Sequence, residues 1–268
     1  MPSSAPDEVA TLTASMRTLA VGHGIEIEAP TEPLDGRELL LLIEDLYNRL
    51  AARTLQVNPF WRAMVEDPEG VDDRVFFGMC IENYHLLFRE SYFDAPALSY
   101  PENTRVRFLL NEFYCEEFGH DELLLRALSS VGIAREELFL SVPLAPTMAL
   151  CNALSFWARH DPLFFFTTLG PLEGRDVEID SYVVAARARG LPEEFVGPIL
   201  THANINKSSE HGLLTRAIFE EVAVVPPGTA ARIIQSTGLF MAIYDRFYSG
   251  VWHHYRTCTD LLRRVDEI

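Results

Sequence analysis

Residues 111–128, NEFYCEEFGHDELLLRAL, decide the fold, because their apolar and polar positions recur with the spacing of a helix. Within this stretch, Glu117 and His120 are three residues apart. On a helix, both side chains project from one face, one turn from each other. A carboxylate and an imidazole so placed can share a metal ion, as Glu-x-x-His pairs do in di-iron helical bundles. The alternative is a buried polar contact that holds no metal.

The composition bounds the class of protein. The chain has 268 residues, of which 48% are hydrophobic, enough for a large buried core. The net charge of −17 argues against binding nucleic acid or an anionic membrane, because phosphates attract lysine and arginine. Four widely spaced cysteines without a CxxC pair indicate reduced thiols. With no apolar run of about 20 residues and no secretion signal in MPSSAPDEVATL, we expect a cytoplasmic protein.

Helical periodicity is strong from residue 37 onwards and weak before it. We expect residues 1–36 to form a partly mobile N-terminal extension, with one short helix near residues 7–21. Residues 37–268 are expected to form a single helical domain. Val, Ile and Thr runs that alternate with period two are missing. The pattern therefore predicts an all-α bundle of about seven to nine helices, in which sites are built between facing helices.

A second glutamate–histidine pair, Glu82-x-x-His85, has the same spacing as the first. With eight histidines and 39 acidic residues, roughly one such pair is expected by chance, so the spacing alone is weak. Both pairs lie among apolar residues, where charged groups are rare unless they are paired or bind metal. For Glu82 and His85, the alternatives are an exposed position or hydrogen bonds across the bundle.

Three further candidate residues follow in the second half of the chain. Glu173 comes after the apolar run LFFFTTLGPL, so it either meets a partner in the core or stands exposed at the start of the next helix. His202 and His211 share a predicted helix over residues 192–222, but a straight helix places them on opposite faces. Both face one site only if the helix carries an extra residue, as in a π-bulge. Otherwise, one of them faces solvent.

Three stretches resemble the haem-oxygenase-like superfamily, and the resemblance covers roughly residues 40–264. FGMCIENYHLLFRE resembles the early helix that bears a glutamate, EEFGHDELLLRAL resembles the Glu-x-x-His helix, and LTHANINKSSEHGLLTRA is similar to the late helix. This superfamily includes non-haem di-iron oxidases and oxygenases, pyrroloquinoline-quinone synthase and thiaminase II-like proteins. The resemblance implies a haem-oxygenase-like helical bundle.

The resemblance also implies a set of metal ligands. The di-iron members hold iron with an early Glu, the Glu-x-x-His pair, a middle Glu and a late His-x-x-x-Asp-x-x-His. Carried onto this sequence, the implied ligands are Glu82, Glu117, His120, Glu173, His202 and His211. The late Asp has no counterpart in either register of the helix predicted over residues 192–222, which leaves open whether the second iron site is complete.

The function implied is that of an O₂-dependent non-haem iron oxidase or oxygenase, with two Fe(II) ions and O₂ as cosubstrate. Its partner would be a small metabolite such as an amino acid or acyl chain, and proteins of this fold often form homodimers. The alternatives are a cofactor-independent oxidase of the pyrroloquinoline-quinone synthase type and a non-catalytic binding protein whose metal site has decayed. The sequence contains no GxGxxG, GxxxxGK[ST] or GxSxG motif, so nucleotide binding and serine hydrolysis lose support.

Overall fold

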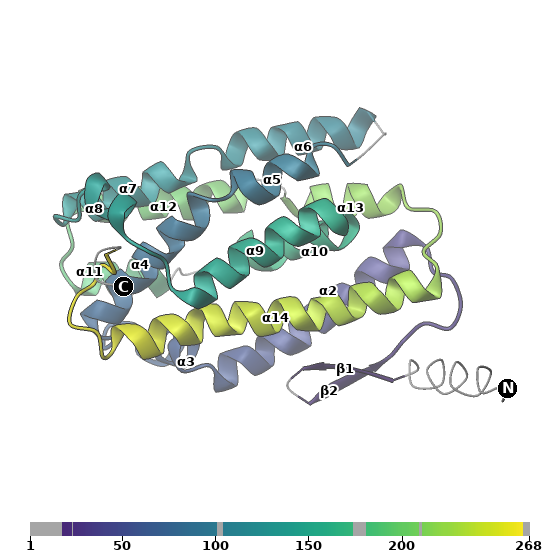
Figure 1. Cartoon of the computed structure of the whole chain (residues 1–268), viewed down its shortest axis with the longest axis horizontal. Coiled ribbons are helices and arrows are strands. Elements are labelled where there is room, and N and C mark those ends of the chain that lie inside the picture. Colours follow the sequence, from purple (N-terminus) through teal and green to yellow (C-terminus); the bar gives the residue numbers. More distant parts are fainter. Residues whose placement is uncertain (1–17, 23, 101–103, 174–180, 209–210, 265–268) are drawn as a thin grey trace, which may run out of the picture.

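The computed structural model describes residues 18–22, 24–100, 104–173, 181–208 and 211–264. This part of the chain is helical apart from one short hairpin, which confirms the all-α prediction (Figure 1). The helices are α2 (Gly36–Val57), α3 (Pro59–Glu66), α4 (Asp73–Leu87), α5 (Ser91–Ala97), α6 (Thr104–Glu117), α7 (His120–Ser130), α8 (Arg135–Leu140), α9 (Ala145–His160), α10 (Pro162–Glu173), α11 (Ser181–Ala188), α12 (Glu193–Ser208), α13 (His211–Glu220) and α14 (Pro227–Tyr255). No helix in these ranges is long and apolar enough to cross a bilayer.

The longest helix, α14, runs along one side of the bundle and packs against α2, α4 and α9 (Figure 1). On the opposite side, α7 packs against both α4 and α12, and α5 packs against α9. These contacts place α7, which carries His120, against α12, which carries His202, and α6 ends at Glu117 two residues before α7 begins.

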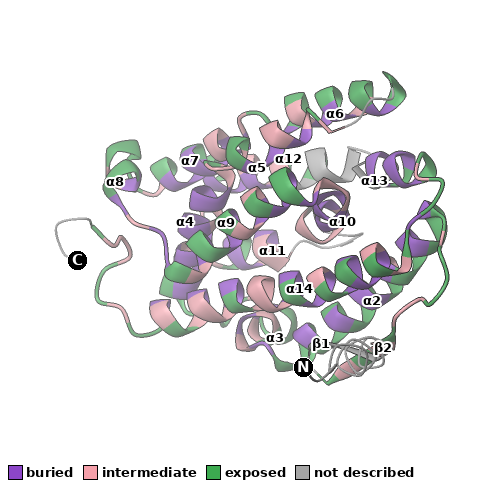
Figure 2. Cartoon of the chain, turned by 45° about the vertical axis from the view of Figure 1, so that its right-hand side comes forward, coloured by how far each residue is buried: buried purple, intermediate pink, exposed green. Residues whose placement is uncertain are grey.

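Each outer helix buries one stripe of apolar side chains and exposes the other face to solvent (Figure 2). On α2, the buried stripe recurs at spacings of three and four, with Leu39, Ile43, Leu46 and Leu50 fully buried. Helix α10 differs, because its consecutive Phe164, Phe165 and Phe166 are all fully buried. A helix that is apolar all round lies inside the bundle, and α10 packs against α2, α9, α13 and α14.

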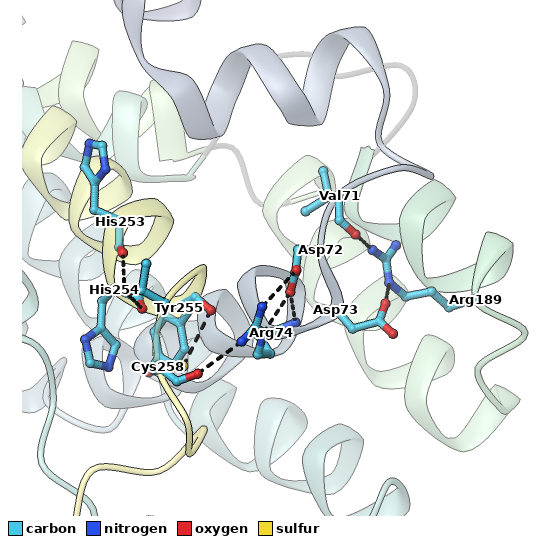
Figure 3. A network of polar contacts seen from close by, with 10 residues as sticks. Val71, Asp72, Asp73, Arg74, Arg189, His253, His254, Tyr255 and Cys258 are labelled. Carbon is cyan, nitrogen blue, oxygen red and sulfur yellow. Dashed lines mark hydrogen bonds and ion pairs between the residues drawn. The ribbon is translucent and has the colours of Figure 1, made fainter.

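Polar contacts from two neighbours fix the start of α4 (Figure 3). Asp72 is the N-cap residue, and its carboxylate accepts from the backbone N–H of Arg74 at 2.9 Å. The Arg74 side chain donates to the carbonyl of Cys258, just beyond α14, at 3.1 Å. Arg189, just beyond α11, pairs with Asp73 at 2.8 Å. These contacts set the position of α4, which carries Glu82 and leads to Glu90.

One of the long helices expected from the sequence is divided in the structure. The Glu-x-x-His segment is split between α6 and α7. Residues 193–208 and 211–220 are helical as α12 and α13, and the two residues between them lie outside the described part of the chain. The described part of the chain has more helices than the seven to nine expected, and several of them are short. The break between α6 and α7 is only two residues long, so the apolar periodicity continues across it and conceals it in the sequence. The four cysteines are free thiols, as their spacing predicts.

The N-terminal region contains an element that the sequence analysis missed. β1 (Thr18–Gly22) pairs antiparallel with β2 (Ile25–Glu28), and β1 lies against α14 (Figure 1). The short helix expected near residues 7–21 is therefore wrong for residues 18–21, and residues 7–17 lie outside the described part of the chain. The sequence IEIE of β2 alternates between partly buried and exposed side chains, but four residues are too few for a clear period-two signal.

The close approach of α4 to α14 gives a test of this packing. A Cβ atom at Gly78 would lie 2.2 Å from the ring of Tyr255. We expect Gly78→Ala to lower the free energy of unfolding by about 1–3 kcal/mol, because the extra methyl overpacks the core. Urea unfolding measures the change. Gly228→Ala is the matched control, because Gly228 is also helical and has no atom within 4 Å of its Cβ position. Equal stability of the Gly78 and Gly228 variants would contradict the close contact.

Candidate metal centre

Glu117 and His120 lie at the junction of two helices. Glu117 is the last residue of α6 and His120 is the first residue of α7. Gly119 between them has a φ of +93°, a left-handed conformation that is costly for residues with a Cβ atom and lets α6 end and α7 begin within two residues. Both side chains are buried, and His120 Nδ1 lies 2.7 Å from Glu117 Oε2. The pair thus meets as the spacing predicts, although it is not on one continuous helix.

A third acidic side chain joins this pair. Glu90, in the turn between α4 and α5, offers a carboxylate oxygen that forms a group with Glu117 and His120 in which all ligand atoms lie within 4.8 Å of one another. Metal–ligand distances of about 2.1 Å place two ligands of one ion roughly 3–4 Å apart. The group therefore has nearly the dimensions of a metal site. It is the one group of this kind among the residues that the structure describes.

His202 on α12 lies against His120, with 4.8 Å between the ring centroids. Burial, followed by the charge of the neighbouring imidazole, lowers the pKa of His202 to about 4. His202 is therefore neutral at pH 7, and neutral imidazole is the form that binds metal ions. The Nε2 atom of His120 is buried and has no hydrogen-bond partner among the described residues. Because such an atom is costly to bury alone, a ligand at this position would stabilise the site.

The acidic side chains of this group lie between two cavities. An inner cavity of about 50 Å³ is bounded by Glu90, Asp94, Glu117 and His202, and by apolar side chains. Those apolar side chains include Leu86, Phe93, Phe113, Leu154, Leu169 and Leu172. The inner volume is enough for one or a few molecules of the size of water. A wider outer cleft of about 270 Å³ shares Glu90, Asp94 and Glu117 with the inner cavity.

The structure places Glu82 in a different environment, outside the group formed by Glu90, Glu117 and His120. Its Oε1 accepts a hydrogen bond from the hydroxyl of Tyr255 at 2.9 Å. Its Oε2 accepts from the backbone N–H of Leu144 at 3.0 Å and from the hydroxyl of Thr147. Burial raises the pKa of the Glu82 carboxyl despite these three donors. Glu82 thus has the cross-bundle hydrogen bonds that the sequence left open as an alternative.

The remaining predicted ligands are only partly described. Glu173 is the last residue of α10 and His211 is the first residue of α13, and the side chains of both lie outside the described part of the structure. Residues 209–210, between α12 and α13, lie outside the described part of the chain. The placement of His202 and His211 on opposite faces of one straight helix therefore stays a prediction.

Sequence reasoning did not single out Glu90 and Asp94, which line both cavities beside Glu117. Glu90 is the last residue of FGMCIENYHLLFRE, the stretch that resembles an early glutamate-bearing helix. Glu82, in the same stretch, has the stronger sequence signal, because a histidine follows it three residues later. The sequence pattern that indicates them is the spacing of four residues between Glu90 and Asp94. This spacing places two carboxylates on one face of a helix, among aromatic residues.

Comparison with solved structures identifies the fold. No family model and no curated protein matches the sequence. A domain of unknown function from Shewanella denitrificans, described as having a heme oxygenase-like fold, superposes with a TM-score of 0.63. The match covers 83% of this chain and 94% of that one, at 17% sequence identity. The chain has a haem-oxygenase-like fold. At this identity the likeness is one of fold, so the function of this haem-oxygenase-like protein must be argued from its own side chains.

The buried carboxyl of Glu82 gives a pH-dependent prediction. Because its pKa is raised, the folded state binds the proton more tightly than the unfolded state, and its contribution to stability is lost as pH rises through the raised pKa. Glu82→Gln replaces the titrating carboxyl with a neutral amide. The Tyr255 hydroxyl can rotate to accept a hydrogen bond from the N–H of this amide. As pH rises above the ordinary pKa of a glutamate carboxyl, we expect the free energy of unfolding of the wild type to fall relative to that of Glu82→Gln. Urea unfolding at several pH values measures both free energies.

The matched control is Glu112→Gln, which removes an exposed carboxylate from α6. If the free energies of unfolding of the wild type and Glu82→Gln differ by the same amount at every pH, the raised pKa of Glu82 is contradicted.

Proposed function

We propose that this haem-oxygenase-like protein is an O₂-dependent non-haem iron oxidase or oxygenase that acts on a small organic metabolite. The observation that carries the proposal is the group formed by Glu90, Glu117 and His120, whose ligand atoms lie within 4.8 Å of one another beside an apolar cavity. The proposed ligands are again carboxylates and an imidazole, and Glu90 takes the role that the sequence analysis gave to Glu82.

The donor chemistry of this group suits ferrous iron. Carboxylate oxygens and imidazole nitrogens are the ligands of non-haem Fe(II) centres that leave positions open for O₂. Two carboxylates also balance the charge of a divalent cation, which matters because an unpaired charge is costly in a buried site. His202, neutral and packed on His120, adds a second imidazole next to the group. Bound iron would pass electrons from the substrate to O₂, so that the substrate is oxidised as O₂ is reduced.

The side chains around the group can exclude water and admit a substrate. Leucine and phenylalanine side chains enclose the inner cavity and exclude water from one side of the group. The outer cleft, with Phe88, Tyr114 and Phe118 among its lining residues, gives access from the other side. Its volume of about 270 Å³ is close to the lower limit of ligand pockets, which favours a small substrate such as an amino acid or a short acyl chain.

Iron binding tests the proposal directly. Anaerobic loading with Fe(II), followed by gel filtration and metal analysis, should leave about one iron ion per chain, or about two if His202 recruits Glu173 and His211 to a second site. Glu90→Gln, Glu117→Gln and His120→Ala should each retain much less iron, because each removes a ligand. Circular dichroism should show unchanged helical content in all three variants.

Glu82→Gln is the matched control, because it changes a buried glutamate that is hydrogen-bonded to Tyr255 and lies outside the group. It should retain as much iron as the wild type. If Glu82→Gln loses iron and Glu90→Gln does not, Glu82 and not Glu90 is the early carboxylate ligand. A folded wild-type protein that retains no iron would refute the proposal and favour the cofactor-independent oxidase or the binding protein.

A further inference from the structure

A separate cavity lies between α9 and the turn that joins α4 to α5. Its volume is about 450 Å³, and its lining residues include Arg89 and Tyr92 from the turn and α5, and Ser155 and Arg159 from α9. Helices α5 and α9 run side by side (Figure 1). None of the residues that line this groove lines the two cavities beside Glu117.

The groove carries positive charge in a strongly acidic protein. Arg89, Arg159 and His160 line it, and no carboxylate does, although the chain as a whole has a net charge of −17. Two acids directly follow lining residues in the sequence. Glu90 follows Arg89 but lines the two cavities beside Glu117, and Asp161 follows His160 but is held by Arg232, with N–O distances of 2.8 and 3.0 Å. Within the described ranges, neither Arg89 nor Arg159 forms an ion pair with a carboxylate. The groove therefore lacks a counter-ion from the chain itself.

Arg89 is held in place by a buried histidine. Its Nη1 donates to the carbonyl of His85 at 2.8 Å and lies 3.4 Å from His85 Nδ1. The Ser141 hydroxyl donates to the carbonyl of Leu138, so it must accept from His85 Nε2, 2.9 Å away. Nδ1 of His85 then carries the lone pair that faces Arg89. Both contacts use Nη1, which leaves Nε and Nη2 of Arg89 as donors for a ligand.

The wall formed by α9 supplies complementary groups. Asn152, Ser155, Phe156 and Arg159 are spaced three and four residues apart, so they lie on one face of the helix. They offer an amide, a hydroxyl, an aromatic ring and a guanidinium. Basic residues in the last turn of a helix offset its dipole, which would account for Arg159 and His160 alone. It does not account for Arg89, which comes from another element and lines the same groove.

We propose that this groove binds a small organic anion, a phosphate monoester or a carboxylate, with an apolar or aromatic body. The guanidinium groups of Arg89 and Arg159 would bind the anionic head, because planar guanidinium donors match the oxygens of both groups. The body of the ligand would lie on the rings of Tyr92 and Phe156. Anion binding at this groove does not require iron, so it can be tested separately from the proposed oxidase activity.

Calorimetric titration of the full-length protein, kept metal-free with a chelator, tests the site. The probes are phenyl phosphate and phenylacetate, with benzyl alcohol as the neutral probe, all at one ionic strength set with chloride. We expect saturable binding of at least one anion and none of benzyl alcohol. Arg159→Gln should weaken that binding about tenfold, the effect of losing one charged hydrogen bond.

Three further variants separate a built site from general charge attraction. Ser155→Phe fills the groove without changing the charge and should abolish binding. Arg89→Gln should weaken binding as Arg159→Gln does, with folding checked by circular dichroism because Arg89 is partly buried. Arg62→Gln is the matched control, since it removes the same charge from α3, outside the groove.

Each result has a definite meaning. Binding of phenyl phosphate alone assigns a phosphorylated ligand, binding of phenylacetate alone assigns a carboxylate, and binding of both assigns organic anions as a class. The proposal is overturned if neither anion binds saturably. It is also overturned if Arg62→Gln weakens binding as much as Arg159→Gln, or if neither Arg159→Gln nor Ser155→Phe weakens it.

Discussion

A carboxylate buried in an apolar helical bundle needs a partner that donates hydrogen bonds or carries positive charge, and this requirement shapes the interior of the protein. The chain meets it in two ways. Glu82 is surrounded by donors from α9 and α14, namely a backbone N–H and two hydroxyls. Glu117 lies against an imidazole and near a second carboxylate, Glu90. The first arrangement has three donors of its own, whereas the second brings together groups that share the ability to bind a cation.

The two glutamates differ in the side chains that surround them. The partners of Glu82 join α4 to α9 and α14, so its carboxylate connects three helices in the core. Three hydrogen-bond donors of the protein itself therefore satisfy the Glu82 carboxylate. In the group of Glu90, Glu117 and His120, two acidic side chains converge, and two like charges in a buried site repel each other unless a proton or a cation lies between them. The inner and outer cavities both adjoin Glu90 and Glu117.

The break between α6 and α7 has a similar consequence for the site. Glu117 at the end of one helix and His120 at the start of the next are held by two separate packing arrangements, since α6 packs against α13 and α7 packs against α4 and α12. The same turn region that supplies Glu90 on one side supplies Arg89 to the groove along α9 on the other. Adjacent residues thus line two chemically different cavities, since Glu90 lines the acidic one and Arg89 lines the basic one.

The sequence by itself determined the helical class, because apolar residues recur at spacings of three and four along most of the chain, and the resemblance in three stretches pointed to the fold. It also determined that Glu117 and His120 would meet, since a spacing of three residues keeps two side chains close even when a glycine interrupts the helix. Only the tertiary structure decided that Glu90, and not Glu82, joins them. That choice depends on Tyr255 and Thr147, which are distant in sequence, and local periodicity carries no information about which distant helix will supply a hydrogen-bond donor.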